Sequence, residues 1–284
     1  MNIIFCAGIS VRTGTNYMGS IFSEIPEVAS VPKNYSKGEF PFFRKQVIQN
    51  YDSWIKGFNR RMFAQPPLNK KKFASFYGES FLNYLKAEYE IKEKTIFVKD
   101  PGLYNIERFY DYFPKGKLII LTRSAPDLIA SSLKASLQIR KSQSKKKKIS
   151  AKIKYYSGYN MYTYAKAYKK HATHLRFLRE QLKGGFLEVK YENLVNEPNK
   201  YICEILDYCE VPYNNEIIQN TVNAKVVGSS YFGSKKHSQE WGALEKTSDF
   251  KPVGRYKSWG WFNRFIYNRI AKKSNEFVGY SHNL

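Results

Sequence analysis

Residues 2–24 read as a β-strand, a glycine-containing loop and a helix in immediate succession. The run Asn2–Ala7 is almost entirely apolar, the loop extends from Gly8 to Gly14, and a helical pattern begins at Thr15. A loop of this kind surrounds an anion with backbone N–H groups and with the positive end of the helix. The sequence therefore predicts that this segment binds a phosphate-like group.

The loop lacks the lysine that a nucleoside triphosphatase requires. The triphosphate-binding pattern is GxxxxGK[ST], and aligning Gly8 and Thr15 with it places Thr13 at the second glycine and Gly14 at the lysine. The cation of the loop is Arg12, whose planar guanidinium suits an oxygen of a phosphate or a sulfate. Chemistry on a magnesium triphosphate is therefore disfavoured.

Short apolar runs alternate with longer helical patterns along the rest of the chain. Strands are expected at runs rich in Ile, Leu, Val or Phe, namely Asn2–Ala7, Thr95–Lys99, Lys117–Thr122 and Phe186–Lys190. Helices are expected at Thr15–Glu24, Phe73–Ile91, Tyr104–Tyr112, Pro126–Leu137, Tyr155–Leu182, Lys200–Tyr208 and Trp261–Glu276. The alternation predicts an α/β, P-loop-like three-layer fold with a central, mostly parallel sheet flanked by helices, in a single domain of residues 1–284. Ligands of such folds bind beyond the carboxyl ends of the strands.

The charge of the chain is strongly positive and unevenly distributed. Lys and Arg number 47 against 24 Asp and Glu, and 14 of the basic residues lie between Leu128 and Arg179, a stretch without any acid. This charge favours an anionic partner, although the run Lys145–Lys148 taken alone is also compatible with a solvated surface. The first apolar run is too short for a membrane span and has no basic flank, so we expect a cytoplasmic protein, with peripheral attachment to a membrane surface as an alternative.

The stretch KLIILTRSAPDLIASSL, residues 117–133, supplies a second anion site. A predicted strand delivers Arg123 to its end, and Ser131 lies on the second turn of the helix that follows. With this stretch the chain resembles the PAPS-dependent sulfotransferases, whose 5′-phosphosulfate loop reads RSGTT and whose 3′-phosphate motif reads RDPxDxxxS. The resemblance implies that PAPS (3′-phosphoadenosine 5′-phosphosulfate) is the donor and PAP the product, with no metal. It assigns the 5′-phosphosulfate to Arg12, Thr13, Gly14, Thr15 and Asn16, and the 3′-phosphate to Arg123 and Ser131.

Four further segments extend the resemblance over most of the chain: EIPEV (24–28), VKYENLVNEP (189–198), SSYFG (229–233) and GRYKSW (254–259). By this resemblance Tyr191 and the loop residues Ser229, Ser230 and Tyr231 lie on the adenine side. The RKG triplet of the cytosolic small-molecule enzymes is missing before Gly254, so Arg255 is the expected substitute. The resemblance as a whole implies a PAPS-dependent sulfotransferase of the bacterial or carbohydrate type.

The catalytic residues are predicted through a resemblance to the heparan glucosamine sulfotransferases. KGEFPFF (37–43) is similar to their KExHFF, in which the Glu takes the acceptor proton, and Glu39 matches that Glu. VKDPGLY (98–104) is similar to EK[ST]PxYF, which makes Lys99 an active-site cation beside Arg12. Asp100 is the alternative base. A histidine base is disfavoured, because the KTHxP segment of the small-molecule enzymes has no equivalent in this chain.

Two other functions compete with this interpretation. A P-loop kinase acting on a nucleotide or a sugar would use a similar fold but needs the missing lysine, and a basic nucleic-acid-binding module would explain the charge but not the ordered motifs. The matches at Glu39 and Lys99, together with the acid-free stretch 128–179, favour a saccharide or glycolipid acceptor that is acidic or lipid-linked. No nucleic acid is expected as a partner, and the oligomeric state stays open.

Overall fold

A sheet of five parallel strands forms the centre of the protein. The computed structural model describes residues 2–31, 39–61, 67–137, 145–227, 243–244 and 251–281. The strands are β1 (Asn2–Gly8), β2 (Val28–Ser30), β3 (Thr95–Asp100), β4 (Lys117–Thr122) and β5 (Leu187–Lys190), and their order in the sheet is β2-β3-β1-β4-β5. Four of the five coincide with the predicted apolar runs, which confirms the parallel α/β sheet.

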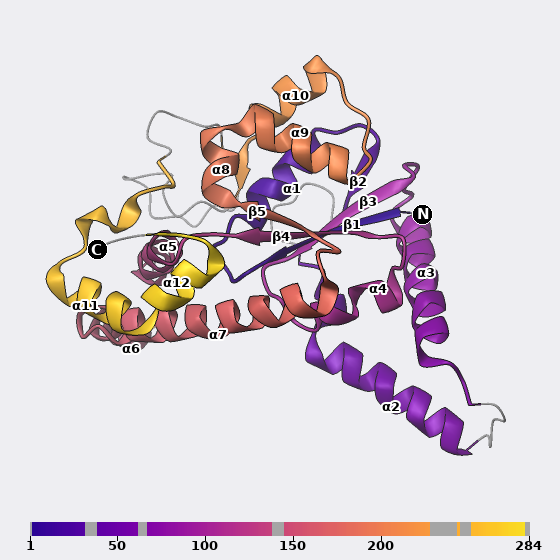
Figure 1. Ribbon diagram of the computed structural model, residues 1–284, viewed down its shortest axis with the longest axis horizontal. Helices are drawn as coiled ribbons and strands as arrows, with labels where there is room; N and C mark the ends of the chain where they lie inside the picture. The colour runs from indigo at the N-terminus through magenta and orange to yellow at the C-terminus, as the bar shows by residue number, and fades with distance from the viewer. Residues whose placement is uncertain are drawn as a thin grey trace.

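Helices cover both faces of this sheet (Figure 1). On one face lie α1 (Thr15–Ser23), α8 (Tyr191–Asn196), α9 (Pro198–Tyr208) and α10 (Asn215–Val222). On the other lie α2 (Lys45–Arg61), α3 (Lys70–Glu88), α4 (Phe109–Tyr112), α5 (Ala125–Leu137), α6 (Lys145–Tyr156), α7 (Tyr159–Leu182), α11 (Trp261–Ile270) and α12 (Lys272–Val278). The three-layer arrangement is therefore also as predicted.

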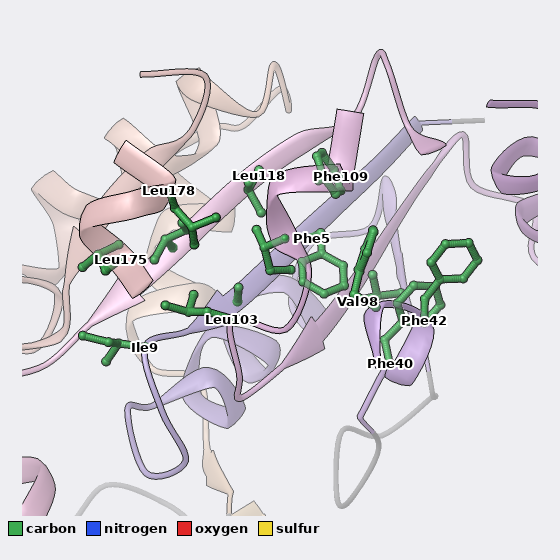
Figure 2. Packing of buried hydrophobic residues seen from close by; sticks show 14 of the residues in the cluster. Phe5, Ile9, Phe40, Phe42, Val98, Leu103, Phe109, Leu118, Leu175 and Leu178 are labelled. Atoms are coloured by element: carbon green, nitrogen blue, oxygen red, sulfur yellow. The ribbon is translucent and has the colours of Figure 1, made fainter. Parts of the chain in front are cut away.

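The strands are apolar throughout because both of their faces are buried. Along β1, Phe5 and Ala7 join the core under α7, whereas Ile4 and Cys6 join the core under α1. Figure 2 shows the first of these cores, where Phe5 lies beside Leu118 of β4. The sheet thus holds its carboxyl edge rigidly between two packed layers.

Three of the predicted helices are interrupted. The helix expected over Tyr155–Leu182 is two helices, because Gly158 adopts a left-handed conformation with φ 76° and ends the pattern between α6 and α7. A Cβ at that position would come within 2.4 Å of the Phe262 ring of α11, so the tertiary packing requires a glycine there. The helix expected over Trp261–Glu276 likewise divides into α11 and α12, and Tyr104–Tyr112 is a short 3₁₀ turn (Ile106–Arg108) followed by α4.

Smaller elements complete the chain. Strand β6 (Val226–Val227) pairs antiparallel with β7 (Ala243–Leu244), and short 3₁₀ turns occur at Pro41–Phe43 and Arg255–Ser258. Within the described residues, no helix combines the length and the apolar character that crossing a bilayer requires.

Candidate active site

The predicted site residues meet at the carboxyl edge of the sheet. The register pairs Cys6 with Lys99 and Ala7 with Asp100 between β1 and β3. On the other side of β1, Gly8 pairs with Leu121 of β4, two residues before Arg123. The loops that follow these three strands therefore leave the sheet side by side, as expected for a parallel sheet whose ligands bind at this edge.

The loop between β1 and α1 is held by its own side chains. The Ser10 N–H donates to Thr13 Oγ1 at 3.2 Å, and the Thr13 hydroxyl in turn donates to the Ser10 carbonyl. Gly14 has φ 117°, and a Cβ at this position would lie 2.4 Å from the Tyr191 ring, so only glycine fits. Among the described residues no side chain caps α1, whose first N–H groups have no acceptor within the helix. These groups can accept an anion as their partner.

Arg12 and Arg123 lie together, although the sequence suggests two separate anion sites for them. Arg123 donates through Nη1 to the Arg12 carbonyl at 2.8 Å and through Nη2 to the Pro252 carbonyl at 2.6 Å. The Arg12 Nε donates to Ser131 Oγ at 3.4 Å, so the loop, Arg123 and the predicted serine form one connected group. The Arg123 guanidinium also lies 4.6 Å from the centre of the Tyr191 ring.

Positive charges accumulate around this group. Burial lowers the pKa of Arg12, and the nearby Arg123 lowers it further. Burial likewise lowers the pKa of Lys134 on α5, with a further contribution from Arg255. Tyr191 has its pKa raised by burial, and the positive charges of Arg123, Arg255 and Arg12 oppose that rise. These cations repel one another. An anion with several negative charges would relieve that repulsion, and the N–H groups at the start of α1 would also bind it.

One polar atom of this group is left for such an anion. Among the described residues, the buried Nε of Arg123 has no hydrogen-bond partner, although a buried guanidinium N–H normally has one. This N–H and the first N–H groups of α1 are hydrogen-bond donors that an anionic ligand can accept.

Asp127 is a buried carboxylate beside the site, and the sequence analysis did not assign it a role. Asp127 is fully buried on α5 and accepts hydrogen bonds from the backbone N–H groups of Gly254 at 3.1 Å and of Arg255 at 2.7 Å. It also accepts a bond from the Ser124 hydroxyl at 3.2 Å. Asp127 thereby fixes the segment that carries Arg255 against α5. The signal in the sequence was the acid within RSAPD, the motif that also contains Arg123.

The predicted acid and base residues form a second group on the other side of β1. Arg44 donates through Nη2 to Glu39 Oε2 at 2.8 Å and through Nε to Asp100 Oδ2 at 3.0 Å, so one guanidinium joins both candidate bases. Glu39 is exposed, whereas Asp100 is buried and also accepts from the Gly102 N–H at 2.8 Å. Burial raises the pKa of Asp100, which Gly102 and Arg44 partly oppose.

Lys99 is buried rather than exposed at the sheet edge. Its side chain is 2% exposed, and burial lowers its pKa while Glu39, Cys6 and Asp100 oppose the shift. The adjacent segment is fixed to it, because the Phe40 N–H donates to the Lys99 carbonyl at 2.7 Å. The Phe40 and Phe42 rings, with centroids 5.7 Å apart, pack into the core beside β3 (Figure 2). The backbone next to Glu39 is therefore fixed to β3 by the hydrogen bond of Phe40.

Arg44 is not among the residues that the sequence analysis singles out, although it directly follows the pair Phe42-Phe43.

The residues predicted on the adenine side are only partly described. Ser229, Ser230 and Tyr231 lie outside the described residues. Tyr191, the other residue predicted there, is buried against Gly14 and Arg123. In the part of the chain that the structure describes, no three His, Cys, Asp or Glu side chains gather into a possible metal site.

Comparisons with known proteins agree with this geometry. The model of a sulfotransferase family matches residues 4–215. The sulfotransferase domain from the Synechococcus PCC 7002 olefin synthase superposes with a TM-score of 0.52 at 16% identity, covering 100% of this chain and 96% of that one. Mouse sulfotransferase SULT7A1, solved in complex with PAP, superposes with a TM-score of 0.53 at 11% identity, covering 96% of this chain and 83% of that one. A search of curated proteins found no match. At these identities the two structures are evidence for the fold alone.

Proposed function

The chain belongs to the sulfotransferase family, and we propose that it moves the sulfuryl group of PAPS to a hydroxyl or an amine of a saccharide or glycolipid. The observation that carries the choice of donor is the joined pair Arg12 and Arg123, with the buried Arg123 Nε still lacking a partner among the described residues. A nucleotide with phosphates at its 3′ and 5′ positions would supply acceptors for both.

Within this proposal the two ends of the donor have different partners. The backbone N–H groups of residues 13–16 and the Arg12 guanidinium hold the 5′-phosphosulfate, and Arg123, Ser131 and Arg255 hold the 3′-phosphate. Asp127 acts as a positioning residue, because it fixes the backbone of Arg255. The Tyr191 ring packs against Gly14 and under the Arg123 guanidinium. We therefore assign Tyr191 the role of positioning the residues of both phosphate sites. The rest of the adenine side, Ser229–Tyr231, lies outside the described residues and stays a prediction from the motif.

PAPS supplies a sulfuryl group whose leaving group is a stable phosphate, so the protein has to provide positioning, charge stabilisation and a proton acceptor. Arg12 and Lys99 supply positive charge near the transferring group. Glu39 takes the proton of the acceptor, because it is the exposed member of the acidic pair, whereas Asp100 is buried. Asp100 holds Arg44, and Arg44 in turn orients the Glu39 carboxylate.

Ligand-dependent thermal stability tests the choice of donor. PAP at about a hundred times its dissociation constant should stabilise the protein by roughly 2.7 kcal/mol, whereas ATP with Mg²⁺ and single-stranded DNA should have little effect. Stabilisation by ATP with Mg²⁺ alone would indicate a kinase, and stabilisation by DNA alone would indicate a nucleic-acid-binding module. A screen of saccharides, glycolipids and phenols with labelled PAPS then tests the acceptor class separately from the donor.

A further inference from the structure

Helices α6 and α11 lie beside the start of α7 at one end of the molecule (Figure 1), and these three helices carry six strongly exposed apolar side chains there. We call this surface the basic–apolar face, and its apolar members are Ile149, Ile153, Tyr156, Tyr159, Trp261 and Phe265. None of them has a role in the donor site described above.

Helix α6 presents its apolar residues to solvent. Ile149, Ile153 and Tyr156 recur at the spacing of one helical face, and they are 59%, 62% and 78% exposed. A surface helix normally turns such a stripe toward the protein core. In α6 the neighbouring Tyr155 makes the contact with the core instead. The exposed stripe is therefore available to an apolar partner outside the molecule.

Helix α11 extends this stripe. The Phe262 ring fills the space above Gly158, the residue that separates α6 from α7. Trp261, whose ring lies 5.7 Å from that of Phe262, is 78% exposed. The start of α11 thus lies against the turn between α6 and α7, and it exposes a tryptophan there. Tryptophan and tyrosine are the side chains that favour the boundary between water and lipid.

Cations accompany these apolar side chains. On α6 the exposed Lys146 and Lys147 precede the stripe, the exposed Lys152 and Lys154 fall between its members in sequence, and the sequence has no acid from residue 128 to 179. The sequence of α11 also contains arginines and no acid. A helix with exposed apolar residues and lysines along its polar side is the type that lies in the interface of an anionic bilayer.

We propose that the basic–apolar face docks on a surface of anionic phospholipid. A polyanion in solution, such as a nucleic acid or an acidic polysaccharide, would satisfy the lysines but would leave Ile149 and Ile153 against a hydrophilic partner. A lipid surface satisfies both, because the headgroups bind the cations while the isoleucines and Trp261 enter the acyl boundary. Docking at this face would hold the enzyme at the same membrane as a lipid-linked acceptor. The inference does not depend on the identity of donor or acceptor.

Cosedimentation of the full chain with vesicles tests the proposal. The protein should bind vesicles of phosphatidylcholine mixed with phosphatidylglycerol and should bind pure phosphatidylcholine at least about tenfold more weakly. Reversing Lys152 and Lys154 to Glu should weaken binding by about twentyfold or more. The double substitution Ile149→Ser and Ile153→Ser, and separately Trp261→Ser, should each weaken it by about tenfold.

Matched substitutions on α3, at the opposite end of the molecule in Figure 1, serve as controls. Lys86→Glu and Phe76→Ser change an exposed lysine and an exposed aromatic there, and both should leave vesicle binding unchanged. Thermal unfolding verifies that every variant is folded. If the lysine reversals abolish binding while the isoleucine and tryptophan variants bind normally, the face is a patch for polyanions and the lipid proposal is wrong. Equal binding to both kinds of vesicle, or to neither, also overturns it.

Discussion

Replacing Arg44 with glutamine should destabilise the protein in a manner that depends on pH. The Asp100 side chain is only 6% exposed, whereas the Arg44 side chain that pairs with it is 33% exposed. Glutamine keeps some of the volume and hydrogen-bonding capacity of Arg44 but removes the charge. The Arg44→Gln variant would therefore keep a buried carboxylate whose cation is gone.

The size of the effect follows from these contacts. Removing one partner of a buried ion pair costs about 3–5 kcal/mol, because the other charge is left without compensation. Two features reduce that cost here: Arg44 is partly exposed, and the Gly102 N–H continues to donate to Asp100 at 2.8 Å. We expect a loss of about 2–3 kcal/mol in the free energy of unfolding, which for a protein of this size is a decrease of about 5 °C or more in Tm.

The sign of the pH dependence is set by Asp100. Burial raises its pKa above the ordinary value of 3.8, and Arg44 opposes that rise, so in the variant the pKa rises further. Above that pKa the buried carboxylate is charged and the full destabilisation is present. As the pH falls through it, Asp100 becomes protonated and the loss relative to the native protein shrinks. Glu39 and Lys99 are the other charged side chains near Asp100, and neither is substituted in the variant.

Urea unfolding from about pH 3 to about pH 9, a range that begins below the ordinary pKa of 3.8, provides the measurement. The double variant Arg44→Gln with Asp100→Asn removes both charges, so it should recover much of the lost stability and lose the pH dependence. Glu39→Gln, which breaks only the exposed half of the cluster, should cost less than about 1 kcal/mol. A loss in Arg44→Gln that is equal at every pH, or no recovery in the double variant, would refute the reasoning.

Three further predictions concern the donor site and the base. Arg123→Ala should weaken PAP binding by about 2 kcal/mol or more, measured calorimetrically, and unchanged affinity with an intact fold would contradict the phosphate assignment. Gly14→Ala should destabilise the protein by about 2–3 kcal/mol in urea unfolding, because the new Cβ would clash with the Tyr191 ring and because the φ of residue 14 is 117°, which alanine rarely adopts. Gly57→Ala in α2, where a Cβ would have open space, should not destabilise the protein. Glu39→Gln should lower kcat about a hundredfold without changing PAP affinity. Near-normal turnover in Glu39→Gln together with a large loss in Asp100→Asn would identify Asp100 as the base.

The sequence is informative where a local pattern determines the structure. Strands β1, β3 and β4 are continuous apolar runs because both of their faces are buried, and such runs are visible without any tertiary information. Strand β2 was not predicted, because Val28–Ser30 is too short to form a pattern. The break at Gly158 was not predicted either, since the helical spacing continues across it and the Phe262 ring that requires the glycine comes from α11.

The same distinction between local patterns and distant contacts applies to the residues of the candidate site. Arg12, Arg123 and Ser131 could be found because each lies in a motif next to a strand end, and the structure brings them together. Arg44 and Asp127 were missed, because their importance lies in partners that are distant in sequence. Arg44 bridges two carboxylates from different segments. Asp127 lies in the same motif as Arg123, but the motif does not indicate that its partner is the backbone N–H of Gly254.

The strand order of the sheet also constrains how the newly made chain can fold. Strand β1 lies between β3 and β4, yet its partners at Thr95 and Lys117 leave the ribosome only after α1, β2, α2 and α3 have been made. During that time both edges of a strongly apolar strand are without their native neighbours. Such a segment pairs readily with other chains, and long-range parallel pairing is intrinsically slow. A chaperone that binds short apolar segments should therefore crosslink to residues 3–7 during synthesis, and should release them once β4 has emerged.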